Sequence, residues 1–206
     1  MGYHRAGFEV VGVDIKPQPH YPFEFHQYDA LTFLFLAPTP HLRRGPFDAV
    51  HASPPCQAYS VATANQDRSV YPDLLADTRR LLEQTGRPWV IENVPGAPMR
   101  ADYRLCGCMF GLPLLQRARL FETSWHGFAL TYKCRHVEPA LSVTGQGVGG
   151  GNGQRDRLRE YLGRNVNSQD ERAAMGIAWM TREEYTEAIP PAYTEFIGKQ
   201  LLEVLA

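Results

Sequence analysis

The sequence predicts an α/β protein with a mainly parallel sheet and helices on both of its faces. Between residues 8 and 124, apolar runs of strand length alternate with helical or proline-containing crossovers, a pattern typical of a parallel sheet. The chain of 206 residues is long enough for one sizeable core and a small additional lobe. Its composition, 44% apolar and 21% charged, is typical of a globular protein.

The expected strands are apolar runs that end in a turn or at a polar residue. They are Phe8–Ile15, Phe47–Ala52, Arg87–Gly96 and Arg117–Ser124. Residues 16–23 contain three prolines and should form a loop, whereas the run 28–36 places Asp29 before another apolar stretch. Residues 71–85 predict a helix, because Pro72 and Asp73 suit its first turn and the leucines that follow share one face.

The rest of the chain divides into two segments. Residues 125–167 are basic, aromatic and then glycine-rich, and predict a small irregular lobe beside a core formed by residues 1–124. Residues 168–206 predict helices that pack back on this core. Capping boxes are expected at Ser168 with Glu171 and at Thr181 with Glu184, and the last helix should start after Pro190-Pro191. Its apolar stripe is Tyr193, Phe196, Ile197, Leu201, Val204 and Leu205.

Charge and cysteine content narrow the class of protein. The net charge is −1, but residues 100–164 hold ten basic and five acidic side chains, which favours either a solvated basic face or a surface for an anionic polymer. Four cysteines in a chain of this length do not indicate a disulfide framework. With no membrane-spanning run and no signal peptide, we expect a cytoplasmic protein with reduced thiols and no membrane partner.

Two polar features follow predicted strands, where ligands collect in α/β sheets, and a third lies on a strand. Cys56, in "HASPPCQAYS", lies on a turn stiffened by two prolines, and is either a small buried hydrophobe or an exposed, ionisable thiol. Glu92, in "ENV", is either ion-paired or functional, because a carboxylate there needs a partner or a task. Arg117 and Arg119, in "RARLF", share one face of a strand, which is either solvated or turned to a site.

A thiolate, a carboxyl group and a guanidinium at neighbouring strand ends suit the chemistry of a cytosine ring. Carbon 5 of cytosine is a poor nucleophile until a thiolate adds to carbon 6. A carboxyl group at ring nitrogen 3 stabilises the adduct, and a guanidinium can hold oxygen 2. The combination is covalent catalysis with preorganised electrostatics.

These motifs resemble those of the DNA (cytosine-5) methyltransferases. "PPCQ" (Pro54–Gln57) is similar to the nucleophile motif of that family, "ENV" (Glu92–Val94) to the next catalytic motif, and "RARLF" (Arg117–Phe121) to the third. "GYHRAGFEVVGVDI" (Gly2–Ile15) resembles the helix and second strand of the cofactor site. The resemblance implies a Rossmann-like fold that binds S-adenosylmethionine, and a target cytosine flipped out of double-stranded DNA.

The resemblance also assigns roles by position. Cys56 would be the nucleophile, Glu92 would contact nitrogen 3, and Arg119 would hold oxygen 2. The residues expected to shape or brace the substrate site are Pro55, Gln57, Ser60, Asn93 and Arg117. Those expected at the cofactor are Asp14, Ile15, Asp29, Ala30 and Pro54. The candidates for contact with DNA phosphates are Lys133, Arg135, Arg155, Arg157, Arg159 and Arg164.

Two departures from the family shape these expectations. The family's first strand and glycine-rich cofactor loop would precede Gly2, so the cofactor site is expected to lack the backbone amides of that loop. The recognition region, residues 125–168, is short, which predicts a short or relaxed DNA recognition sequence read by a monomer.

Two further patterns are less specific. "GQGVGG" (Gly145–Gly150) satisfies a dinucleotide-binding fingerprint, but no strand follows it, and a DNA-facing glycine loop is the preferred interpretation. Cys106 and Cys108, with Cys134 and His136, could together bind zinc, but their spacings are tighter than the common patterns. Ordinary thiols and a solvated histidine are therefore favoured, and no metal is predicted.

Three functions remain open. The leading one is methyl transfer from S-adenosylmethionine to carbon 5 of cytosine in DNA. The second is a catalytically impaired DNA-binding module that lacks the cofactor loop. The third is an exocyclic amino methyltransferase, which "SPPC" approaches, although a covalent thiol has no use in that reaction. The biological role, either protection of viral DNA or restriction-linked modification in a bacterial or phage-infected cell, is left open.

Overall fold

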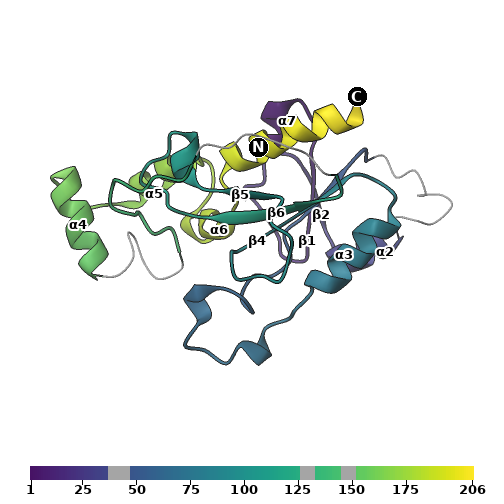
Figure 1. Cartoon of the computed structure of the whole chain (residues 1–206), viewed down its shortest axis with the longest axis horizontal. Helices are drawn as coiled ribbons and strands as arrows, with labels where there is room; N and C mark the ends of the chain where they lie inside the picture. The colour runs from purple at the N-terminus through teal and green to yellow at the C-terminus, as the bar shows by residue number, and fades with distance from the viewer. Residues whose placement is uncertain (37–46, 126–132, 145–151) are drawn as a thin grey trace.

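The computed structural model describes residues 1–36, 47–125, 133–144 and 152–206, and these form a mixed α/β fold (Figure 1). The α/β class is thereby confirmed. The strands are β1 (Val11–Asp14), β2 (Glu24–Gln27), β3 (Val50–Ala52), β4 (Trp89–Asn93), β5 (Tyr103–Leu105) and β6 (Arg119–Thr123). The α-helices are α1 (Gly2–Ala6), α2 (Ala30–Leu36), α3 (Leu75–Gln84), α4 (Asn152–Leu162), α5 (Ser168–Met175), α6 (Arg182–Glu187) and α7 (Pro191–Leu205). Three short 3₁₀ helices are η1 (Val61–Thr63), η2 (Arg68–Val70) and η3 (Gly107–Phe110).

The described strands form two sheets, and the larger one is mixed. Strands β1 and β2 pair in parallel, and a four-stranded sheet has the order β3-β4-β6-β5. Strands β3 and β4 are parallel, whereas β6 is antiparallel to both β4 and β5. The prediction of a mainly parallel sheet is therefore wrong for this half. No α-helix separates β4, β5 and β6, and antiparallel neighbours need no crossover helix.

Helices cover both faces of the four-stranded sheet, as predicted. Trp89 and Ile91 of β4 face one cluster, which includes Leu81 and Leu82 of α3. Val90 points to the opposite face, where it joins a cluster that includes Tyr193 and Ile197 of α7. This alternation is the period-two pattern of a strand buried on both faces. Truncating a fully buried leucine such as Leu82 to alanine should cost about 2–5 kcal/mol.

Helix α7 begins at Pro191, close to its predicted start. It packs against α1. A Cβ atom on Gly2 would lie 2.2 Å from the carbonyl oxygen of Pro191, so only glycine permits this approach of the two helices. Of the predicted stripe, Tyr193, Ile197 and Leu201 are buried. The expectation for Val204 and Leu205 was wrong, because the last turn of α7 lies at the surface and leaves them exposed.

A third cluster lies beside the sheet and is built from segments far apart in the chain. Leu115, Leu141 and Leu158 pack there with Met175 and Tyr185 of α5 and α6. The sequence predicted irregular structure up to residue 167, but α4 forms over Asn152–Leu162. In Figure 1, α4 lies at the end of the molecule away from α2 and α3.

The two predicted capping boxes have different outcomes. Thr181 and Glu184 form one at the start of α6, and the Thr181 N–H donates to Glu184 Oε2 at 2.7 Å. At α5 the cap is Asn167 with Asp170, one residue before the predicted pair, because the side chain of Asn167 accepts from the first-turn amides. Among the residues that the structure describes, no helix is long and apolar enough to cross a membrane.

Candidate active site at the ends of β3, β4 and β6

Cys56 lies on the predicted turn just after β3. The Cys56 carbonyl accepts hydrogen bonds from the N–H groups of Tyr59 (3.0 Å) and Ser60 (2.9 Å), which closes the turn. The same turn contacts the one after β4, because a Cβ atom on Gly96 would lie 2.5 Å from the Tyr59 carbonyl oxygen. Cys56 is half-buried, so its thiol is neither sealed in the core nor fully solvated.

Asn93, the last residue of β4, joins the two turns. The Asn93 Nδ2 group donates to the carbonyl of Pro54 at 3.0 Å, and its Oδ1 accepts from the Val94 N–H at 2.9 Å. Asn93 is 1% exposed, so this amide cannot exchange its partners for water. The position of Cys56 is therefore coupled to the end of the strand that carries Glu92.

Glu92 and Arg119 form a buried ion pair between antiparallel strands. Arg119 Nε lies 2.8 Å from Glu92 Oε1, and both side chains are largely shielded from water. Arg119 Nε is close enough to Glu92 Oε1 for an ion pair but is not aligned for a hydrogen bond. Glu92 Oε1 can therefore still accept a hydrogen bond. Burial raises the pKa of the Glu92 carboxyl above its usual range, despite opposing effects from Arg119 and Ser53.

Arg117 is half-buried and braces the site from the side of the third cluster. Its guanidinium donates to the carbonyls of Val143 (2.5 Å) and Thr186 (2.7 Å), while its Nε has no partner. Burial and the charge of Arg119 lower the pKa of Arg117 to about 10, and Glu92 and Cys56 act in the opposite direction. Cys56 and Glu92 therefore both lie within electrostatic reach of this guanidinium.

A chain of hydrogen bonds that the sequence did not predict leads to Glu92. Tyr3 Oη and His51 Nδ1 are 2.7 Å apart, and His51 Nε2 lies 3.1 Å from Ser53 Oγ. The Ser53 side chain in turn hydrogen-bonds Glu92. Desolvation lowers the pKa of His51 to about 4, so its imidazole is neutral near pH 7. A histidine within an apolar strand, separated from "SPPC" by Ala52 alone, was the signal available in the sequence.

Four of the five predicted cofactor residues lie at or just after the ends of β1 and β2, whereas Pro54 lies in the turn after β3. Asp14 ends β1, and its carboxylate accepts from the N–H of Lys16 at 2.8 Å. The Ile15 side chain is 65% exposed, which is unusual for isoleucine and leaves an apolar surface beside Asp14. Asp29 accepts from the Thr32 N–H at 2.7 Å, so it caps α2, and Ala30 next to it is exposed.

The residues expected near DNA fall into three groups. Gln57 is exposed beside Cys56, whereas Pro55 and Ser60 are half-buried. The basic side chains at the surface are Lys133, Arg135, Arg155, Arg157 and Arg159, and Arg159 lies 3.7 Å from Asp156. Arg164 is engaged elsewhere, because its guanidinium donates to both carboxylate oxygens of Asp170, at 2.6 and 2.8 Å. The glycine segment 145–150 lies outside the described residues.

A scan against protein-family models and a search of curated proteins each found no match. The fold and the site define an α/β protein in which a thiol, a buried carboxyl and two arginines meet at neighbouring strand ends.

Proposed function

We propose that this protein is a DNA (cytosine-5) methyltransferase with a Rossmann-like core, in which Cys56 adds to carbon 6 of a flipped-out cytosine. The observation that carries the proposal is the Glu92–Arg119 pair, held next to the Cys56 turn by the Asn93–Pro54 hydrogen bond. Each of the three groups is expected to contact a different position of one pyrimidine ring.

The site supplies the groups that this addition needs. As the Cys56 thiolate forms its bond to carbon 6, electron density moves through the ring toward nitrogen 3 and oxygen 2. A Glu92 carboxyl with a raised pKa retains its proton more readily and can donate it to nitrogen 3. Arg119, next to Glu92, can donate to oxygen 2, where negative charge develops. Once carbon 5 carries the methyl group, its proton is lost to solvent water, nitrogen 3 returns its proton to Glu92, and elimination of Cys56 restores the free thiolate.

S-adenosylmethionine would supply the methyl group that carbon 5 accepts. The residues present fit its adenosine end in their chemistry. Asp14 offers a carboxylate for ribose hydroxyls, Ile15 offers an exposed apolar face for the adenine ring, and Asp29 offers an acceptor for the adenine amino group. These residues lie at the end of β1 and directly before α2. They occur along the chain before the Cys56 turn, as the family's cofactor residues do.

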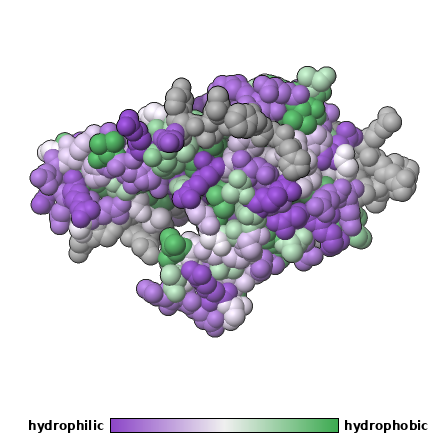
Figure 2. Space-filling view, viewed as in Figure 1, coloured by the Kyte–Doolittle hydropathy of each residue, from purple (hydrophilic) through white to green (hydrophobic). Residues whose placement is uncertain are grey.

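The segment after Cys56 is suited to meet the DNA. It carries η1 and η2, and Figure 2 shows it projecting from the body below a hollow in the surface. Val61 and Val70 on this segment are 90% and 70% exposed. Arg68 ties the segment to the Cys56 turn by donating to the Ser60 carbonyl at 2.8 Å. Exposed apolar side chains next to a nucleophile can fill the space that a flipped base leaves in a duplex.

The proposal is tested with duplex DNA that contains 5-fluorocytosine. Fluorine at carbon 5 blocks the final elimination, so the Cys56 thioether stays trapped and is seen as a shifted band on a denaturing gel. We expect a band that depends on S-adenosylmethionine and is absent in Cys56→Ala. Asn165→Ala is the control, because it changes an exposed side chain outside the candidate active site. A band that persists in Cys56→Ala would contradict the proposal.

The alternative is a DNA-binding module of the same ancestry without methyl transfer. It predicts that DNA binding is retained while no covalent band forms. The wild-type chain alone separates the two possibilities, provided that duplex binding is measured in the same samples by a gel-shift assay.

A further inference from the structure

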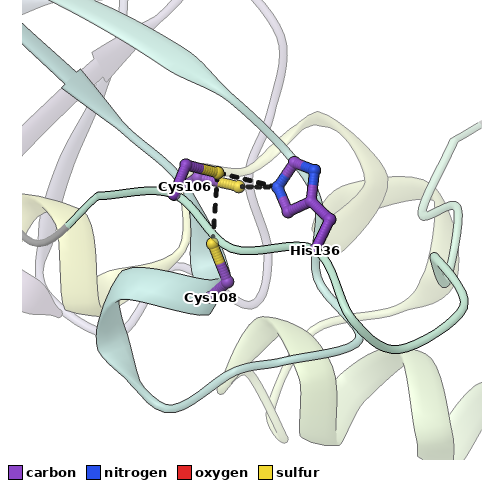
Figure 3. Close-up of side chains that lie close together, drawn as sticks. Cys106, Cys108 and His136 are labelled. Carbon is purple, nitrogen blue, oxygen red and sulfur yellow. Dashed lines mark hydrogen bonds between the residues drawn. The ribbon is translucent and has the colours of Figure 1, made fainter.

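Three cysteines and a histidine outside the candidate active site lie together. The Sγ atoms of Cys106, Cys108 and Cys134 and a ring nitrogen of His136 all lie within 4.8 Å of one another. Figure 3 shows Cys106, Cys108 and His136 directed toward a common point. Two ligands come from the end of β5 and the start of η3, and two from a loop about 30 residues later.

The separations match those of a tetrahedral metal centre. Cys108 Sγ lies 3.2 Å from Cys134 Sγ, and His136 Nε2 lies 3.3 Å from Cys106 Sγ and 2.8 Å from Cys134 Sγ. Zinc bonds of about 2.3 Å to sulfur and 2.0–2.1 Å to nitrogen place tetrahedral ligands about 3.5–3.8 Å apart. The side chains need to separate by less than about 1 Å to meet that geometry.

The backbone around Cys106 and Cys108 is arranged for thiolate ligands. The Cys108 N–H donates to the Cys106 thiol, the kind of outer hydrogen bond that supports a metal-bound sulfur. Gly107, between them, packs so closely that a Cβ atom would lie 2.3 Å from the Leu115 carbonyl oxygen. This approach fixes the loop and holds the two thiols on one side of it.

The loop with the other two ligands has little other support. Residues 133–137 form neither helix nor strand, whereas Glu138 is anchored because its carbonyl accepts from Gln116 Nε2 at 2.7 Å. The charge also fits: three thiolates and one Zn²⁺ sum to −1, and Lys133 and Arg135 flank Cys134. A bound ion would tie the loop to β5. It would also set the direction in which the chain enters the third cluster, which contains Leu141.

We propose that Cys106, Cys108, Cys134 and His136 form a structural Zn²⁺ site. All four positions of a tetrahedron are occupied by side chains, which is the mark of a structural rather than a catalytic zinc. The sequence argument preferred ordinary thiols because the Cys-x-Cys and Cys-x-His spacings are tight. The fold removes that objection, because each of the two pairs needs to supply only two of the four corners of the tetrahedron. The site is independent of the proposed methyl transfer.

The test measures metal content in the full chain. Protein purified in chelator-free buffer should carry one zinc per chain by elemental analysis, and Cys134→Ser should lose it. Cys56→Ser is the matched control, because it removes the one cysteine outside the cluster and should keep the zinc. A chelator should lower the melting temperature of the wild type and of Cys56→Ser but not that of Cys134→Ser.

A second measurement needs no variant and so does not depend on how Cys134→Ser folds. Co²⁺ added to the chelator-treated wild type should give the visible d–d bands of a tetrahedral thiolate site, and Zn²⁺ should abolish them. Substoichiometric zinc together with no tetrahedral Co²⁺ spectrum would overturn the proposal. So would a Cys108–Cys134 disulfide in protein kept under reducing conditions, because it would remove two of the four ligands.

Discussion

The side-chain amide of Asn93 donates to the backbone carbonyl of Pro54 across 3.0 Å, and this bond joins the strand with Glu92 to the turn with Cys56. The two groups that act on one ring in the proposed reaction therefore share a rigid connection that involves neither of their own side chains. A buried amide in this position acts on the geometry of the site rather than on its chemistry.

Replacing Asn93 with alanine should therefore destabilise the fold as well as the site. The Pro54 carbonyl and the Val94 N–H would lose a buried partner, at a cost of about 1–3 kcal/mol in the free energy of unfolding. Urea denaturation measures this cost, and the 5-fluorocytosine complex should form more slowly. Asn165→Ala, at an exposed asparagine, should change stability by no more than about 0.5 kcal/mol. Equal effects of the two substitutions would contradict the assigned role.

The raised pKa of Glu92 predicts a pH-dependent stability difference. Between the usual pKa of 4.5 and the higher folded-state pKa, the folded state binds more protons than the unfolded state, so this carboxyl lowers stability as pH rises. In Glu92→Gln that contribution disappears. The stability of the variant minus that of the wild type should increase as pH rises above 4.5, as measured by urea denaturation at a series of pH values. A difference that is constant or decreases over this range would show that the pKa is not raised.

The contact of Gly96 with Tyr59 predicts opposite effects of two glycine substitutions. A methyl group at Gly96 would meet a backbone oxygen at 2.5 Å, so Gly96→Ala should push the Cys56 turn away and cost about 1–3 kcal/mol. Gly153 lies in α4 with open space around it, and Gly153→Ala should stabilise the protein by about 0.5 kcal/mol. Thermal denaturation of the two variants gives the signs directly, and a neutral Gly96→Ala would rule out the close contact.

A second buried ion pair stabilises the sheet away from the site. Arg79 of α3 donates through Nε and Nη2 to the two carboxylate oxygens of Glu122, each at 2.8 Å, and Glu122 is 2% exposed. Arg79→Ala leaves that carboxylate without its cation and should cost about 2–4 kcal/mol. The neighbouring Arg80 pairs with Asp77 at the surface, so Arg80→Ala should cost no more than about 0.5 kcal/mol. Denaturation in urea measures both costs. Equal denaturant midpoints for Arg79→Ala and Arg80→Ala would contradict the stabilising role of the Arg79–Glu122 pair.

The basic residues of the smaller lobe should differ in their effect on DNA binding. Arg157 is exposed on α4, and Arg157→Ala should reduce the salt dependence of binding by about one phosphate contact. Arg164 is held by both oxygens of Asp170, so Arg164→Ala should leave that slope unchanged. Binding to a duplex at several salt concentrations measures both slopes. If the salt dependence of binding falls more in Arg164→Ala than in Arg157→Ala, the DNA lies on the other side of the lobe.

The sequence predicted those elements whose pattern and ends were both distinctive. Strand β4 was predicted because its apolar run ends in a turn, and α7 because Pro190-Pro191 precedes a helical stripe. Strands β2 and β5 were missed: the first is largely polar and the second has three residues. The apolar run before residue 37 forms α2 over Ala30–Leu36, since seven residues of which six are apolar carry no readable period.

Strand direction and long-range contacts were harder to predict. The antiparallel orientation of β6 follows from the absence of a helix between β4 and β6, but the alternation of apolar runs suggested crossovers. The placement of the three candidate side chains at neighbouring strand ends could be predicted, because Cys56 follows β3, Glu92 lies near the end of β4 and Arg119 begins β6. The thiol and imidazole cluster was named from the sequence but not favoured, because its spacings are tight. Its halves lie about 30 residues apart and meet only through the path of a loop.

The packing of α1 on α7 also has a consequence for protein synthesis. The surface that α1 covers is made of residues such as Pro191 and Thr194, which leave the ribosome long after Gly2 does. A nascent chain that has reached β6 already contains the six described strands, yet α1 still lacks its partner helix α7. Contacts between such distant parts of a chain form slowly. The packing of α1 on α7 therefore forms only after α7 has been translated.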